Sequence, residues 1–472
     1  MLKIKKSLDN LIIFLREKTE NFIYAYFFPT ITALISLLFW IADLQLIGFT
    51  IVALITCFVL IVFDDFLPIV PLVFIIPMCF RIPSVATTES PALVIVLFVL
   101  IFLFIGLHFL KHPVKIEIDK FFYMLLGVLA LFLIAGIFYG DFSNYFEAID
   151  LVAISTLAPL AIHFFLYNKI KLNDKVDYKR YFCFCFICST VLAAVQLSYV
   201  YFYIKFVGRW PYGSMPGGYT WANSNHVANL ILIAVPLCCY MMLSSKRIWA
   251  WFITLIFLYV AVYFSKSDGG LATLITFTPF LMYAVYKNAY RHNKTFLRYT
   301  YFVLISAVLL AIAILGLFFY EELIDFIISS SSSNGRTHLY NLAFDYFAKK
   351  PIFGIGFGNG KICLDLFKEA PENCGYFHST FFHVLACAGS IGIIVYTLYY
   401  VVRIKYLAKG NTLLGHFALF SFLAFAVYGI IDNGEFNIVL MFMATVITTV
   451  GLFNKKGSDD KPLPLYANIP KF

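Results

Sequence analysis

Long apolar segments separated by short polar connections make up most of the chain. A helix needs about 20 apolar residues to cross the hydrocarbon core of a bilayer. By this criterion the pattern marks fourteen candidate spans, near 24–42, 46–63, 66–80, 91–110, 121–138, 147–167, 181–204, 227–245, 248–264, 270–286, 299–320, 379–402, 412–431 and 436–453. The third is short and contains three prolines, so a kinked or re-entrant segment and a count of twelve or thirteen remain open. We predict an all-α polytopic membrane bundle of about 12–14 transmembrane helices.

The composition excludes a water-soluble protein. Of 472 residues, 62% are apolar and 13% are charged, whereas soluble domains are about 45–50% apolar and about 25% charged. We expect residues 1–472 to form a single transmembrane domain. The basic start at Lys3, Lys5 and Lys6 precedes a mixed stretch, so we expect no cleaved signal peptide.

The positive charge of the chain has a topological pattern. The formal net charge is +9, and connections on the cytoplasmic side of a membrane protein are enriched in Lys and Arg. With both termini inside, 26 of the 35 basic residues fall on inner connections and nine on outer ones. We therefore expect cytoplasmic termini in the inner membrane, contact with membrane lipids and no nucleic-acid partner.

Two outer connections are long. Residues 205–226 are rich in Gly, Pro and aromatic residues, and residues 321–378 form the longest polar stretch. Within the latter, a helix is predicted from Arg336 to about Lys350, because apolar residues follow helical spacing and Pro351 ends it. Its apolar face comprises Leu339, Leu342, Ala343, Tyr346 and Phe347. We expect this surface helix to lie in an outer loop, 321–378, that carries the active site.

Basic residues and a histidine on the predicted outer side are candidates for catalysis and anion binding. His378 lies where a span begins, and a helix N-terminus favours a neutral imidazole that can accept a proton. Arg336 can fork two hydrogen bonds onto a phosphate. Lys266 has Asp268 two residues away, so it either binds an anion or pairs with that carboxylate. Structural interpretations of the first two, an interfacial histidine and a snorkelling arginine, also remain open.

Weaker candidates lie in the same outer connections. His226 and His338 are further histidines, and Gly354 and Gly356 belong to an alternating glycine series that either approaches a phosphate or forms a turn. Cys363 and Cys374 fall in the outer loop, where an oxidising compartment permits a disulfide. The sequence contains no H-E-x-x-H motif or D-x-D pair on the outer side, so we expect neither a metal nor another cofactor.

Four segments, in this order, resemble the O-antigen ligase and polymerase family of bacterial inner-membrane proteins. They are G-G-Y-T-W-A-N-S-N-H-V-A-N-L, S-K-S-D-G-G-L, G-R-T-H-L-Y-N-L-A-F-D-Y-F-A-K-K-P-I-F-G-I-G-F-G-N-G and F-H-S-T-F-F-H-V-L-A-C-A-G-S-I-G, within about 217–392. The resemblance implies glycosyl transfer from a polyprenyl-diphosphate-linked glycan on the outer membrane face, without a metal.

The resemblance also implies roles for individual residues. Arg336 would hold the donor diphosphate, and His378 would activate the acceptor hydroxyl. The family commonly has Ser-Arg after the middle span, and here either Lys266 or Asp268 takes that place. Arg209 is a further candidate for the diphosphate. We expect supporting roles for Asn223, Asn225, His226, Asp268, His338, Gly354 and Gly356.

Neither the acceptor of the glycan nor the class of protein is fixed by these residues. A polymerase would extend another lipid-linked repeat unit, whereas a ligase would use a lipid A core or a protein. We favour a polymerase, because the outer loop is long and no extra domain suggests a protein acceptor. A lipid-linked glycan flippase is the alternative from another class, but the predicted spans contain few charges and show no duplication. Other polysaccharide assembly proteins are possible partners.

Overall fold

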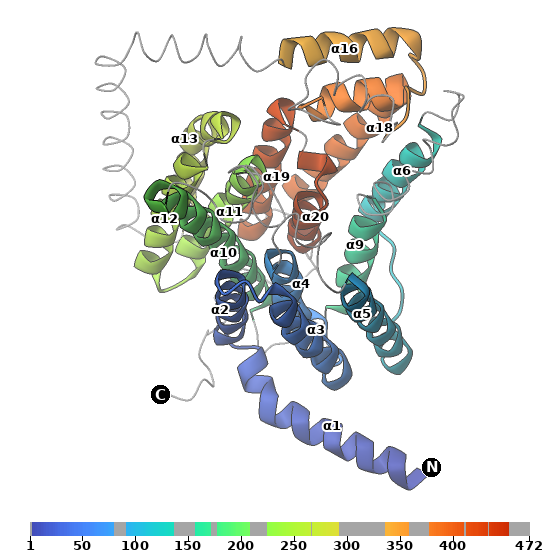
Figure 1. The fold of residues 1–472 in the computed structure, drawn as a ribbon, viewed down its shortest axis with the longest axis vertical. Helices are drawn as coiled ribbons and strands as arrows, with labels where there is room; N and C mark the ends of the chain where they lie inside the picture. The colour runs from blue at the N-terminus through green and yellow to red at the C-terminus, as the bar shows by residue number, and fades with distance from the viewer. Residues whose placement is uncertain are drawn as a thin grey trace. The chain divides into compact units, whose positions relative to one another are not determined.

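The computed structural model describes residues 2–79, 91–135, 156–170, 177–207, 224–265, 267–291, 336–357, 377–409, 412–432 and 434–452. All regular secondary structure in these ranges is helical (Figure 1), as predicted. Two compact units can be distinguished. The first comprises residues within Met1–Glu117 and Phe164–Ser267, and the second comprises residues within Ile118–His163 and Asp268–Leu452.

The first unit is a bundle in which α10 packs against α2, α4, α11 and α12. Its elements are α1 (Leu2–Ile23), α2 (Phe27–Ile41), α3 (Gln45–Val62), η1 (Leu67–Ile69), α4 (Val70–Ile75), η2 (Ile76–Cys79), α5 (Pro91–Lys111), α10 (Tyr178–Val207), α11 (Ser224–Ser244) and α12 (Ile248–Phe264). Nearly all of α11 is buried within this unit. It is therefore a core helix of the unit.

The proline-rich third segment is broken, as its sequence predicts. Pro68, Pro71 and Pro77 fall in η1, α4 and η2, which together replace one regular helix. Each proline lacks an N–H and disturbs the helical hydrogen-bond ladder. Nε2 of Gln196 donates to the carbonyl of Met78 at 2.8 Å. A buried side chain of α10 thereby satisfies a backbone group at the end of the broken segment.

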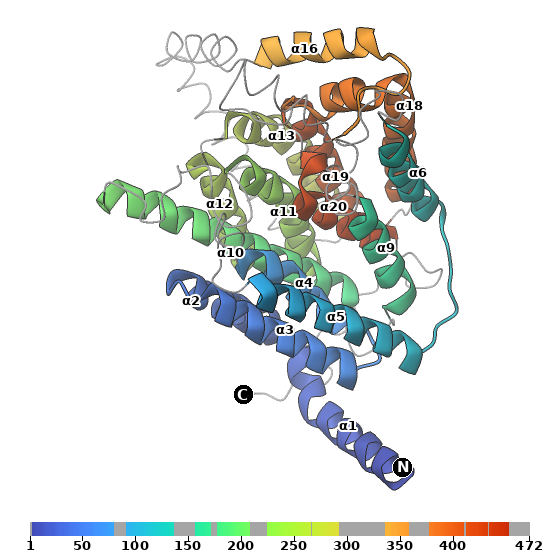
Figure 2. The same cartoon turned by 45° about the vertical axis from the view of Figure 1, so that its right-hand side comes forward.

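The second unit is built around α18, which packs against α6, α16, α19 and α20. Its elements are α6 (Lys120–Ile134), the first part of α9 (Ala158–Lys169), α13 (Asp268–Arg291), α16 (Arg336–Lys349), α18 (Thr380–Lys409), α19 (Leu413–Ile431), η5 (Gly434–Phe436) and α20 (Ile438–Leu452). Figures 1 and 2 show α16 lying alongside the first part of α18. The predicted apolar face of α16 is confirmed, because Leu339, Ala343 and Tyr346 are buried.

Several helices have the dimensions of membrane spans. Among the described residues, six helices are long and apolar enough, namely Gln45–Val62, Tyr178–Phe202, Asn225–Ser244, Asp268–Ala289, Thr380–Lys409 and Leu413–Ile431. The pair Asp9–Ile23 and Phe27–Ile41, bent by 82°, adds a seventh if it forms one broken span. The chain is thus a multi-pass membrane protein. The count of 12–14 stays a prediction, because the segment near 299–320 lies outside the described residues.

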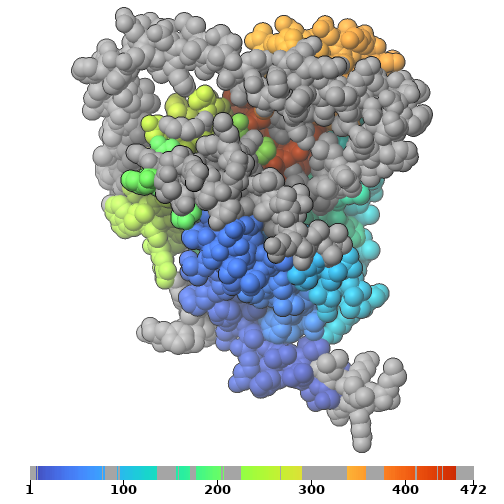
Figure 3. All heavy atoms as spheres, in the orientation of Figure 1, coloured from blue at the N-terminus to red at the C-terminus, as the bar shows by residue number. Residues whose placement is uncertain are grey.

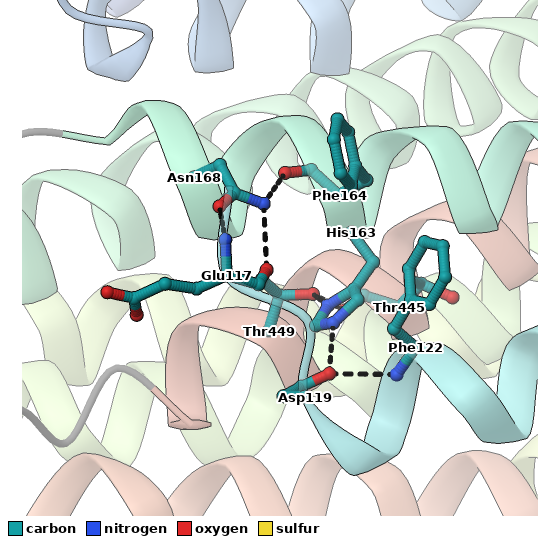
Figure 4. Close-up of polar contacts among 8 residues, drawn as sticks. All are labelled: Glu117, Asp119, Phe122, His163, Phe164, Asn168, Thr445 and Thr449. Carbon is teal, nitrogen blue, oxygen red and sulfur yellow. Dashed lines mark hydrogen bonds and ion pairs between the residues drawn. The ribbon is translucent and has the colours of Figure 1, made fainter. Parts of the chain in front are cut away.

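A buried polar joint holds three helices of the second unit together. His163 of α9 is 1% exposed, and its Nε2 and Nδ1 lie 2.9 Å from Asp119 Oδ1 and 2.8 Å from Thr449 Oγ1 (Figure 4). Asp119 also caps α6 by accepting from the Phe122 N–H at 2.8 Å. The joint therefore connects α6, α9 and α20 through fully engaged polar groups.

Arg403 is a further buried polar group of this unit. Its Nε donates to Thr448 Oγ1 at 2.7 Å, and its guanidinium carbon lies 4.2 Å from the centre of the Phe422 ring. Arg403 directly follows the predicted span 379–402, yet its side chain is fully buried. It therefore contributes to the packing of α18 against α19 and α20.

Candidate functional site

The candidate site is organised around a break in α18. Gly389 has φ 63° and ψ −153°, so the helical hydrogen-bond ladder stops there. The freed backbone groups of α18 pair with the segment that follows α16. These bonds run from Ile355 N to Ala386 O (3.0 Å), Gly356 N to Cys387 O (2.8 Å), Ser390 N to Pro351 O (2.8 Å) and Ile391 N to Ile352 O (3.3 Å). The turn after α16 is thereby inserted into the gap in α18, and the first part of α18 acquires its own direction.

Two glycines permit this close backbone approach. Gly354 has φ +66°, and a Cβ there would overlap the peptide group that joins Cys387 and Ala388. A Cβ on Gly389 would lie 2.6 Å from the carbonyl oxygen of Ile352. Only glycine accommodates both the positive φ and the contact.

The glycine turn is a structural support in this unit. The N–H groups of Gly354 and Gly356 donate to the carbonyls of Lys350 (3.0 Å) and Cys387 (2.8 Å). They are therefore engaged by the protein and do not face a phosphate. Of the two interpretations of the glycine series, the geometry of these two residues favours the turn, which fixes the first part of α18.

His378 lies directly before α18, opposite an aspartate. Its Nδ1 is 3.4 Å from Oδ1 of Asp432, and the side chains are 23% and 4% exposed. Tyr428 Oη donates to the other carboxylate oxygen of Asp432 at 3.4 Å. His378 has φ 47°, a left-handed conformation that costs about 1–2 kcal/mol for a residue with a Cβ. Such strained residues concentrate at functional sites, so the conformation supports a role for His378.

Sequence analysis did not identify Asp432. Its signal is topological: the span 412–431 runs antiparallel to the span that begins after His378, so Asp432 and His378 belong at the same end of this helix pair. An acidic residue at that end is a natural partner for a histidine.

The surface helix α16 reaches the backbone of His378. Tyr340 Oη donates to the His378 carbonyl oxygen at 3.5 Å, and the Tyr340 ring stacks on Phe382 with ring centres 4.1 Å apart. Arg336 is the first residue of α16 and precedes Tyr340 by four positions. The fold therefore places the start of α16 beside the His378 segment.

The opposite side of α16 is uncovered. Figure 3 shows α16 at the surface of the molecule, and His338 and Asp345 on this helix are exposed. His338 thus lies on a different side of α16 from the buried face formed by Leu339 and Ala343.

The first turn of α13 meets the end of α19 that carries Asp432. Asp268 is the first residue of α13 and is exposed. A Cβ on the next residue, Gly269, would lie 3.4 Å from a ring carbon of Tyr428 and 2.9 Å from Cγ2 of Ile431. The second unit therefore gathers the starts of α13, α16 and α18 near the C-terminal end of α19.

The remaining candidates are located less fully. Asn225 and His226 are half-buried in the first turn of α11, in the first unit. Arg209, Asn223, Lys266, Cys363 and Cys374 lie outside the described residues. Within the part of the chain that the structure describes, no group of three or more His, Cys, Asp or Glu side chains is arranged to hold a metal ion.

These features define a polytopic membrane protein with a histidine–aspartate pair beside an arginine-led surface helix. Residues 232–397 match the family model described as O-antigen ligase. This match supports a similarity to the O-antigen ligase and polymerase family, and the resemblance predicted from the motifs is confirmed. The match contains Asp268, Arg336 and His378, whereas Asp432 lies beyond it. A comparison with curated proteins gives no match.

Proposed function

We propose that this protein is a glycosyltransferase that polymerises glycan repeat units carried on polyprenyl diphosphate, at the outer face of the cytoplasmic membrane. The observation that carries the proposal is the contact between His378 Nδ1 and Asp432 Oδ1 beside the first turns of α16. The family match supports the same general reaction, and the apolar helices support a membrane-embedded substrate.

In this proposal His378 is the general base. Because Nδ1 faces a carboxylate, that nitrogen carries the imidazole proton, and Nε2 is left to accept the proton of an acceptor hydroxyl. Asp432 orients the ring and stabilises the imidazolium that forms. A base of this kind contributes ~10²–10⁴ in rate.

The leaving group needs positive charge. The acceptor oxygen forms a bond to the anomeric carbon, the bond from that carbon to the diphosphate oxygen breaks, and the acceptor proton passes to His378 and then to solvent or the diphosphate. Arg336, at the start of α16, holds the diphosphate and stabilises its developing charge. Lys266 and Arg209 add positive charge. Asp268 is the alternative residue at the family's arginine position, but its carboxylate does not supply that charge. In this scheme charge from the protein replaces a metal ion.

A ligase is the second candidate, because the description of the matching family model names that activity. The two reactions share the donor and the base and differ only in the acceptor. Deleting the protein separates them in cells. Loss of a polymerase leaves single repeat units attached to the final acceptor, whereas loss of a ligase leaves polymer on the lipid carrier.

The direct test incubates the purified protein with lipid-linked repeat units and measures the size of the glycan. We expect elongated glycan from the wild-type protein and none from His378→Ala or Arg336→Ala at equal expression. Near-normal elongation by both variants would contradict the proposed site. Movement of the lipid-linked unit across the membrane of vesicles, with no glycosyl transfer, would instead support a flippase.

A further inference from the structure

Two buried hydroxyl groups follow His378 and have no hydrogen-bond partner among the described residues. Ser379 and Thr380 are 1% and 5% exposed, and Ser379 Oγ and Thr380 Oγ1 make no hydrogen bond with the part of the chain that the structure describes. Buried polar side chains nearly always have a hydrogen-bond partner, and an exception requires an explanation. A bound ligand would supply the missing partners.

The usual local partners of these hydroxyls are not used. The Ser379 carbonyl starts α18 by accepting from the His383 N–H at 2.9 Å. A serine in this position normally caps the helix with its hydroxyl as well, but Ser379 Oγ does not. Thr448 in α20 bonds to the carbonyl four residues earlier, Ala444, at 2.8 Å. Thr380 begins its helix and makes no such bond.

Thr380 Oγ1 packs against the neighbouring helix at a glycine. A Cβ on Gly429 of α19 would lie 3.1 Å from Thr380 Oγ1, a tight contact, so a larger residue there would crowd this hydroxyl. Asp432 follows Gly429 by three positions and lies against His378. Consecutive Cα atoms are about 3.8 Å apart, so the backbone of Ser379 and Thr380 lies next to that of the base.

We infer that Ser379 and Thr380 bind hydroxyl groups of the acceptor glycan next to the hydroxyl that His378 deprotonates. A hydroxyl side chain both donates and accepts hydrogen bonds, as a sugar hydroxyl does. The nearby carboxylate of Asp432 disfavours a second anion at this point, so the diphosphate belongs with Arg336. The inference rests on the proposed function and adds an acceptor subsite to it.

The test measures acceptor affinity and stability in the same variants. The purified full-length protein receives saturating lipid-linked repeat units as donor. The acceptor is a fluorescent oligosaccharide, released by mild acid from the host's own lipid-linked glycan. Ser379→Ala and Thr380→Val should each raise the acceptor KM about three- to tenfold, the effect of one lost neutral hydrogen bond. Donor KM should not change, and Ser379→Thr and Thr380→Ser should restore much of the affinity.

Stability separates a binding role from a structural one. Removing an unpartnered buried hydroxyl should leave the unfolding temperature unchanged or raise it. Ser390→Ala is the matched control on the same helix, because Ser390 Oγ donates to the Pro351 carbonyl at 2.7 Å. We expect this control to lower the unfolding temperature and to leave the acceptor KM unchanged. An unchanged acceptor KM in Ser379→Ala and Thr380→Val, or a stability loss like that of the control, would overturn the inference.

A binding measurement separates the inference from the proposed function. The same oligosaccharide should bind to His378→Ala, and this binding should weaken when Ser379→Ala or Thr380→Val is added. If the wild-type protein transfers glycan but oligosaccharide binding does not depend on the two hydroxyls, the inference is overturned and the proposed function stands. Hydroxyl-dependent binding without any transfer by the wild-type protein overturns the proposed function alone.

Discussion

Asp432, at the end of α19, faces His378, at the start of α18, with 3.4 Å between Oδ1 and Nδ1. The aspartate is almost fully buried, and Tyr428 donates to its second oxygen. In the proposed mechanism this carboxylate orients the imidazole and keeps its proton on Nδ1. The pair would then make His378 a directed general base.

Replacing Asp432 by Asn should impair the chemical step. The amide keeps the shape of the carboxylate but no longer stabilises the imidazolium, so we expect kcat to fall ~10²-fold or more. Single-turnover transfer by the purified protein measures this change. The unfolding temperature serves as the control and should change little. A kcat within about twofold of wild type, which is negligible on the scale of general-base catalysis, would remove Asp432 from the mechanism.

Replacing Arg336 should weaken binding of the donor diphosphate and stabilisation of its developing charge. Arginine forks two hydrogen bonds onto a phosphate and lysine offers only a point charge. We expect Arg336→Ala to abolish transfer and Arg336→Lys to raise the donor KM and lower kcat. The donor concentration is varied at a fixed acceptor concentration to measure both. An effect on acceptor KM alone would place Arg336 elsewhere in the site.

Adding a methyl group at Gly354 or Gly389 should disrupt the junction between the turn and α18. Gly354→Ala and Gly389→Ala each combine a left-handed residue with backbone overlap, so we expect a loss of more than ~2 kcal/mol. Gly127→Ala in α6 is the control, because a Cβ there meets no atom within 4 Å. It should be neutral or stabilising by up to ~1 kcal/mol. Unfolding in detergent gives the comparison, and equal behaviour of all three variants would contradict the role of the junction.

Glu435 in η5 should make stability depend on pH. The carboxyl group is 2% exposed, and burial raises its pKa despite the opposing effects of Arg403 and a hydrogen bond from Tyr400 (2.8 Å). The folded state therefore binds the proton more tightly than the unfolded state. The resulting stabilisation is present below the ordinary glutamate pKa and is lost as pH rises through the raised value. Glu435→Gln should remove this dependence.

The measurement for Glu435 compares unfolding temperatures across pH. We expect Glu435→Gln to be more stable than wild type near neutral pH, with the difference shrinking toward pH 4, near the ordinary pKa of about 4.3. Asp345→Asn, at a carboxylate exposed on α16 in the same unit, is measured alongside as the control substitution. Parallel curves for wild type and Glu435→Gln would contradict a raised pKa.

Local sequence determined the helices. Apolar residues at the length of a bilayer predict α3, α10 and α19, because a segment in lipid must satisfy its backbone hydrogen bonds within itself. The spacing of Leu339, Ala343 and Tyr346 gave the buried face of α16, and Pro351 marked its end. The motif around His378 gave one half of the site. These are properties of single segments and can be read one segment at a time.

Tertiary structure decided which groups meet. The pairing of His378 with Asp432 depends on how α18 packs against α19, and no periodicity within either helix encodes it. The hydrogen bond from Gly356 N to Cys387 O exists only because α18 is broken at Gly389 and the turn fills the gap. That the buried hydroxyl groups of Ser379 and Thr380 lack hydrogen-bond partners among the described residues is visible only in the folded structure. Hydrogen bonding and burial depend on all neighbouring elements at once, so these features were decided by packing and not by any one segment of the sequence.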